Sequence, residues 1–98
     1  WEAFFKGKGI NFIKAIDGSV ANYWLNVIVV NSKKDRDEFL KTTNDSNVMT
    51  RPIWRLMSKL SMFKDCQTDG LKNSLWLEDR VVNIPSSVPD GVINRLDK

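Results

Sequence analysis

Three cations recur at intervals of four residues in the middle of the chain. Arg51, Arg55 and Lys59 would therefore lie on one side of a helix that runs through this stretch. Pro52 favours the first position of a helix, because its missing N–H would have no partner there. An arginine at such a turn binds anions well, since its planar fork suits a carboxylate or a phosphate. The spacing predicts either an anion-binding site or an amphipathic helix with a solvated basic side.

Apolar residues in the same stretch follow the same helical period. They stand at positions i, i+3, i+4 and i+7, which gives one apolar stripe: Ile53, Leu56, Met57 and Leu60. A short strand is expected to begin near Val48 and to turn at Arg51 and Pro52 into this helix.

The residue types that the chain lacks exclude several kinds of chemistry. The 98 residues contain no histidine, so Ser-His or Cys-His catalysis cannot be built from this chain. Cys66 is the only cysteine, which excludes an internal disulfide and a cysteine-rich zinc site. We expect no metal site. The net charge of +3 is a mild bias that does not by itself imply nucleic acid.

Length and composition fit one small domain over residues 1–98. The hydrophobic share of 42% and the charged share of 28% are ordinary for a globular protein. The longest wholly apolar run, Val27 to Val30, is far too short to cross a bilayer. Because the chain begins at Trp1 rather than at a methionine, we expect it to be a piece of a longer protein. The single cysteine fits a reducing, cytoplasmic setting.

Strand and helix signals alternate along the chain. The clearest strand runs from Tyr23 to Val30, which is dense in aromatic and β-branched residues. Ser32 stands three residues before Asp35, a capping-box-like start for a helix from about Lys33 to Thr43. Beyond the central stretch, the sequence indicates a loop, a helix, a strand and a last helix: residues 63–70, 71–80, 81–84 and the residues after Ser87.

This order of elements predicts an α+β fold. Few short strands alternate with helices, so we expect a short, mostly antiparallel sheet with helices on one face. Residues 1–22 carry weak signals, because Gly7 and Gly9 interrupt any helix and Asp17–Gly18 indicates only a turn.

Four short motifs, in this order and spacing, resemble one protein family. They are NYWLNV at 22–27, RDEFL at 36–40, TRPIW at 50–54 and NIPSS at 83–87. Together they are similar to the C-terminal part of the DegT/DnrJ/EryC1 aminotransferases, over roughly residues 20–95. Enzymes of this family act on nucleotide-linked keto sugars. The TRPIW form resembles the branch used for legionaminic-acid-type and bacillosamine-type bacterial surface sugars.

The resemblance implies that the chain is the small C-terminal domain of a type I, pyridoxal-phosphate-dependent aminotransferase. In this family a large N-terminal domain holds the cofactor and the Schiff-base lysine, and the enzyme is a homodimer. The small domain closes over the active site. The chain alone would then bind no cofactor and be inactive, with no catalytic residue of its own. We expect no nucleic acid and no membrane among its partners.

The resemblance also implies three contacts to the nucleotide-sugar substrate, made by Thr50, Arg51 and Trp54. In the family a histidine–tyrosine pair often stands where Thr50 and Arg51 stand here. Trp54 could stack on a sugar or base, or be buried against the sheet. Arg51 could bind an anionic part of the substrate, or merely pair with an acid such as Asp45.

Two other functions remain open on the sequence alone. A small basic nucleic-acid-binding domain would fit the isoelectric point of about 9.2 and the tryptophans Trp24, Trp54 and Trp76. Neither an RNA-recognition consensus nor a helix-turn-helix pattern accompanies them. A protein-interaction domain is the other alternative.

Overall fold

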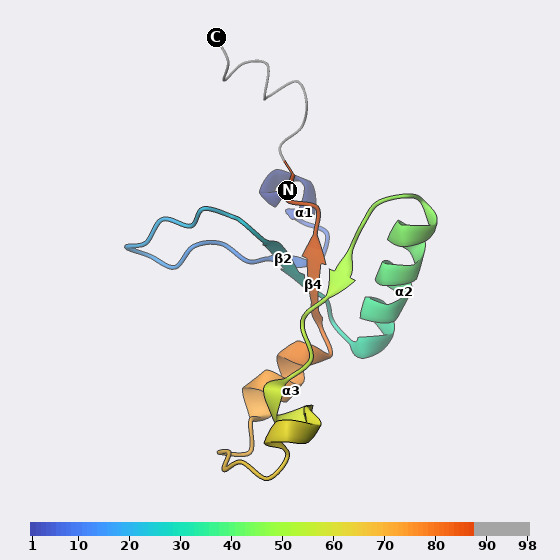
Figure 1. The fold of residues 1–98 in the computed structure, drawn as a ribbon. Coiled ribbons are helices and arrows are strands. Elements are labelled where there is room, and N and C mark those ends of the chain that lie inside the picture. The colour runs from blue at the N-terminus through green and yellow to red at the C-terminus, as the bar shows by residue number, and fades with distance from the viewer. Residues whose placement is uncertain (88–98) are drawn as a thin grey trace.

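Four short strands form one antiparallel sheet in the structure, a computed structural model that describes residues 1–87 (Figure 1). The strands are β1 (Asn11–Phe12), β2 (Asn26–Val29), β3 (Arg51–Pro52) and β4 (Val81–Ile84). Their order across the sheet is β1-β2-β4-β3, and each neighbouring pair is antiparallel. The expected α+β class with an antiparallel sheet is confirmed.

Three α-helices and two short 3₁₀ helices complete the described fold. They are α1 (Glu2–Phe5), α2 (Lys33–Asp45), η1 (Met57–Lys59), η2 (Ser61–Phe63) and α3 (Lys72–Glu78). α2 begins as predicted, because Ser32 Oγ accepts the backbone N–H of Asp35 at 3.1 Å and caps the helix. It ends at Asp45, two residues beyond the predicted Thr43. The helix predicted after Ser87 lies outside the described residues.

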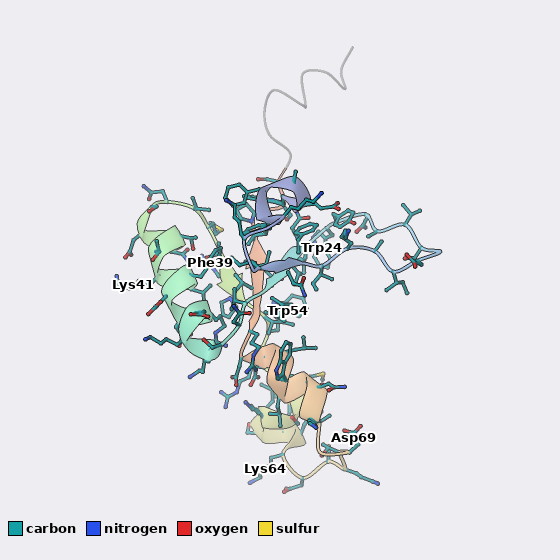
Figure 2. The ribbon with its side chains drawn as sticks, turned by 180° about the vertical axis from the view of Figure 1, so that it is seen from behind. Trp24, Phe39, Lys41, Trp54, Lys64 and Asp69 are labelled. Atoms are coloured by element: carbon teal, nitrogen blue, oxygen red, sulfur yellow. The ribbon has the colours of Figure 1, made fainter. Side chains whose placement is uncertain are left out.

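The core lies on one face of the sheet. In an antiparallel sheet, residues that pair directly across two strands lie on the same face, and so do alternate residues along one strand. By this rule four almost fully buried side chains lie on one face: Ile28, Val30, Val82 and Ile84. α1 packs Phe5 against them, and α2 adds Leu40 and Phe39, of which Figure 2 labels Phe39. Helices on one face are thus confirmed for α1 and α2. α3 lies instead beyond the end of the sheet at which β4 begins (Figure 1).

The segment after Pro52 is not the helix that its spacing predicts. β3 ends at this residue, and no helical turn begins before η1. The N–H of Ile53 donates to the carbonyl of Val81 at 3.2 Å, which continues the pairing with β4. The N–H of Leu56 would bond the Pro52 carbonyl in the predicted helix, but donates to the Glu78 carboxylate at 2.8 Å. Contacts to distant parts of the chain therefore outweigh the local helical pattern.

Proline fits β3 because this strand is an edge strand of the sheet. The N–H of Ile53 points toward β4, so an N–H at position 52 would point away from the sheet. Pro52 consequently removes no hydrogen bond between strands. The apolar stripe expected for the helix is only partly covered, since Ile53, Leu56 and Leu60 are half-buried and Met57 is exposed.

The other elements agree with the sequence signals within a few residues. The strand expected from Tyr23 to Val30 is shorter, because Tyr23 has a left-handed backbone (φ 50°) that interrupts the extended chain. The helix expected over 71–80 is α3, and the strand expected over 81–84 is β4. β1 and α1 lie in the stretch whose signals were weak.

The described residues bury little apolar surface. Six hydrophobic side chains are buried, whereas sixteen large hydrophobic side chains are exposed. Several of these lie on the long loop between β1 and β2, which projects from the sheet and carries Trp24 (Figures 1 and 2). The radius of gyration of 16.2 Å also exceeds the roughly 12–13 Å of a compact chain of this length. The fold is therefore more open than an ordinary small domain.

Candidate functional site

Thr50, the first of the three expected substrate contacts, is buried. It is 2% exposed, and its hydroxyl lies 2.7 Å from the hydroxyl of Thr43. The same oxygen accepts the side-chain amide of Asn44 at 3.0 Å. Both partners belong to α2, so Thr50 holds the start of β3 against this helix. Within the described fold its hydroxyl does not face solvent.

Arg51, the second expected contact, is exposed, and one nitrogen of its guanidinium is hydrogen-bonded to neighbouring residues. Its Nη1 donates to Asn44 Oδ1 at 3.0 Å and to the carbonyl of Thr50 at 2.8 Å. The ion pair with Asp45 is not formed, because Asp45 pairs with Lys41 at 2.6 Å. Within residues 1–87, Nε and Nη2 of Arg51 make no hydrogen bond. The guanidinium is therefore oriented and still has donors for an anion.

Trp54, the third expected contact, extends into solvent. It is 73% exposed, so the alternative of burial against the sheet is wrong for the described fold. Figure 2 shows it near the sheet rather than on the projecting loop that carries Trp24. An exposed indole can stack on a sugar ring or a base.

A cavity of about 720 Å³ lies beside β3. Its lining combines four cations, two carboxylates and two apolar residues: Lys33, Arg36, Arg55, Lys59, Glu78, Asp79, Pro52 and Ile53. We call it the cationic cavity, because four positive and two negative groups give a formal charge of +2. Of the cationic series predicted from sequence, Arg55 and Lys59 line it, whereas Arg51 does not.

Glu78 joins three segments of the cavity wall. Its carboxylate pairs with Lys59 and accepts the backbone N–H of Leu56. Its carbonyl accepts Nη1 of Arg36 from α2 at 2.7 Å. The ammonium of Lys59, followed by the N–H of Leu56, holds the pKa of Glu78 below its ordinary value. The carboxylate is therefore ionised at neutral pH and acts as a fixed anchor of the wall.

The sequence did not identify four of the cavity residues as site residues. Lys33 and Arg36 belong to a run of mixed charges that is typical of a solvated helix surface, and α3 gave no chemical signal at Glu78 and Asp79. Their common place in one cavity depends on how α2, β3 and α3 pack. A periodic pattern within one element cannot reveal such a site.

Another cavity, of about 630 Å³, lies beside α1 and β1. Its lining includes the cations Lys6 and Lys14, and Lys14 is paired with Glu2 at 3.1 Å. None of the three expected substrate contacts lines either cavity, but only the cationic cavity is lined by residues of the TRPIW segment, Pro52 and Ile53. The cationic cavity lies at the TRPIW segment and is therefore the candidate site.

Residues 1–87 contain no group of three or more side chains that could hold a metal ion. None of the described helices has the length and apolar character needed to cross a membrane. Comparisons with models of known protein families and with curated proteins found no match to this chain.

Proposed function

We propose that this chain is the C-terminal domain of a pyridoxal-phosphate-dependent aminotransferase that acts on a nucleotide-linked keto sugar. The parent enzyme is a cytoplasmic homodimer that serves the synthesis of bacterial surface polysaccharide. The chain closes over an active site that the N-terminal cofactor domain supplies. The observation that carries the proposal is the place of the TRPIW segment. It presents Arg51 and Trp54 to solvent, and its Pro52 and Ile53 line the cationic cavity.

The positions of the four motifs support this proposal. NYWLNV leads into β2, TRPIW contains β3, and NIPSS contains the end of β4. RDEFL lies on α2 and supplies Phe39 and Leu40 to the core. The motifs therefore belong to adjoining elements of one sheet and its covering helix, as expected for the frame of a single domain.

The exposed apolar surface also supports a domain that packs on a larger one. Sixteen large hydrophobic side chains are exposed in the described residues, and such surfaces are typical of interfaces. The N-terminal cofactor domain and the second subunit of the dimer are the proposed partners for them.

Substrate positioning is the role we assign to the residues of this chain. Arg51 binds an anionic part of the substrate through its guanidinium, and Trp54 stacks on a ring of the nucleotide sugar. Pyridoxal phosphate supplies the electron sink for amino-group transfer when it is bound. The cavity lysines do not fit the cofactor, because Lys59 is paired with Glu78 and Lys33 is exposed on α2. We assign no covalent step to this chain.

The nucleic-acid-binding alternative fits this surface less well. It requires a continuous basic patch or stripe. Here Glu78 and Asp79 line the cationic cavity itself, and Asp35, Asp37 and Glu38 interrupt the basic residues at the start of α2.

The experiment that tests the proposal uses the complete gene product that contains this chain. The purified protein should show the visible absorbance of bound pyridoxal phosphate. It should also transfer an amino group to a member of a panel of nucleotide-linked keto sugars when amino acids are supplied. The 98-residue chain alone serves as the control and should do neither. A complete product that binds no pyridoxal phosphate would refute the proposal.

A further inference from the structure

The cationic cavity holds positive charge that its own residues do not neutralise. Arg36 donates to the carbonyl of Glu78 and to the carboxylate of Asp37 at 2.9 Å, and Lys59 pairs with Glu78. In the part of the chain that the structure describes, the side chains of Lys33 and Arg55 make no hydrogen bond or ion pair. Both side chains are exposed and can meet an anion that enters the cavity.

We propose that the cationic cavity binds the diphosphate of the nucleotide sugar, with Lys33 and Arg55 as its direct contacts. This inference rests on the proposed function for the identity of the ligand. A diphosphate that joins a nucleoside to a sugar carries about one negative charge on each phosphate. Lys33 and Arg55 are the two cations of the lining that pair with no carboxylate among the described residues, so their charge is available to this ligand.

The size and place of the cavity fit such a ligand. A volume of about 720 Å³ lies within the usual range of small-molecule sites, roughly 300–1,000 Å³. Pro52 and Ile53 line the cavity, and the residues on either side of them in sequence are Arg51 and Trp54. The cavity therefore lies at the TRPIW segment, of which Pro52 and Ile53 are the residues that line it.

The backbone of Arg55 is held between two tertiary hydrogen bonds. The N–H of Ile53 is bonded to β4, and the N–H of Leu56 is bonded to the Glu78 carboxylate. This anchoring reduces the conformational freedom that Arg55 would lose when it binds an anion. Glu78 is thus a positioning residue for Arg55, and it also keeps the Lys59 ammonium paired.

Asp79 opposes the proposed anion. Its carboxylate lines the cavity, and no cation pairs with it among residues 1–87. Removal of this charge should therefore strengthen anion binding, whereas removal of Lys33 or Arg55 should weaken it. If these side chains only stabilised the fold, removal of Asp79 and removal of Lys33 or Arg55 would not change the anion affinity in opposite directions.

Titration calorimetry with inorganic pyrophosphate on the complete gene product tests this inference. We expect one pyrophosphate per chain at this site. Lys33→Ala and Arg55→Ala should each raise the Kd roughly tenfold or more, and Asp79→Asn should lower it. Lys41→Ala is the matched control, because Lys41 lies on α2 outside the cavity and is paired with Asp45 (Figure 2). Circular dichroism and thermal unfolding verify that each variant is folded.

Each outcome decides a separate question. No pyrophosphate binding by the wild-type protein, or equal losses in Lys33→Ala and Lys41→Ala, would overturn the diphosphate subsite. Binding that depends on Lys33 and Arg55 in a protein without aminotransferase activity would support the subsite and refute the proposed function. An active aminotransferase whose KM for the nucleotide sugar is unchanged in both variants would refute the subsite alone.

Discussion

The carboxylate of Glu78 on α3 accepts the backbone N–H of Leu56 at 2.8 Å, although 22 residues separate the two along the chain. Its side chain is only 13% exposed and also pairs with Lys59. The segment between β3 and η1 has no regular secondary structure of its own. One largely buried acid therefore helps to determine the shape of this part of the cavity wall.

Glu78→Ala should destabilise the protein more than Glu78→Gln does. The glutamine oxygen can still accept the N–H of Leu56, whereas alanine leaves this donor without its partner. We expect alanine to lower the free energy of unfolding by about 1–3 kcal/mol and glutamine to lower it by less. Urea unfolding followed by tryptophan fluorescence measures both. Glu38→Ala, at an exposed position of α2, is the control and should change stability by under about 0.5 kcal/mol.

The charge-dependent part of the stabilisation by Glu78 should disappear in acid. Its pKa is lower in the folded protein than in the unfolded chain, so its contribution is complete above the ordinary glutamate pKa of about 4.3. It is lost as the pH falls through the lower, folded pKa. The difference in unfolding free energy between wild type and Glu78→Gln should therefore shrink below about pH 4. A difference that stays constant between neutral and acidic pH would contradict the ion pair with Lys59.

Thr50→Val should reduce stability although the two side chains have the same shape. The substitution removes the hydroxyl that bonds Thr43 and Asn44, and leaves a buried methyl group in its place. We expect a loss of about 1–2 kcal/mol in the free energy of unfolding. Thr42→Val, one residue from Thr43 at an exposed position of α2, is the matched control. Equal effects of the two variants would show that the loss does not come from the hydrogen bonds of the Thr50 hydroxyl.

Arg51→Ala in the complete enzyme should lower kcat/KM for the nucleotide sugar by roughly ten- to a hundredfold. The exposed guanidinium keeps Nε and Nη2 available for the substrate, and a charge-assisted hydrogen bond accounts for an effect of this size. Arg51→Lys should restore activity only in part, because lysine keeps the positive charge but lacks the planar guanidinium that can donate two parallel hydrogen bonds. Steady-state kinetics with unchanged kcat/KM in Arg51→Ala would exclude a substrate contact.

Elements with local determinants could be predicted from the sequence. The cap of α2 needs only Ser32 and Asp35, which lie three residues apart, and β4 ends where Pro85 follows a run of mostly β-branched residues. These interactions form within a few residues of chain, so composition and spacing specify them.

The central segment could not be predicted, because its local pattern is compatible with two structures. Proline suits both the first turn of a helix and an edge strand, and the apolar spacing favours the helix. The deciding contacts come from Val81 and Glu78, more than 20 residues further along the chain. For the same reason, the sequence indicated two of the cavity cations, Arg55 and Lys59, but not their neighbours Lys33 and Arg36 from α2.

Pro52 has a further consequence for how copies of this chain can assemble. An edge strand with free backbone N–H groups offers a template to which another strand can pair, and such pairing leads to aggregation. The position on β3 that would present its N–H outward is occupied by the one residue type that has none. Strand-by-strand growth of the sheet past β3 is therefore disfavoured. At this edge of the sheet, association with a partner must then use side-chain contacts rather than addition of a strand to β3.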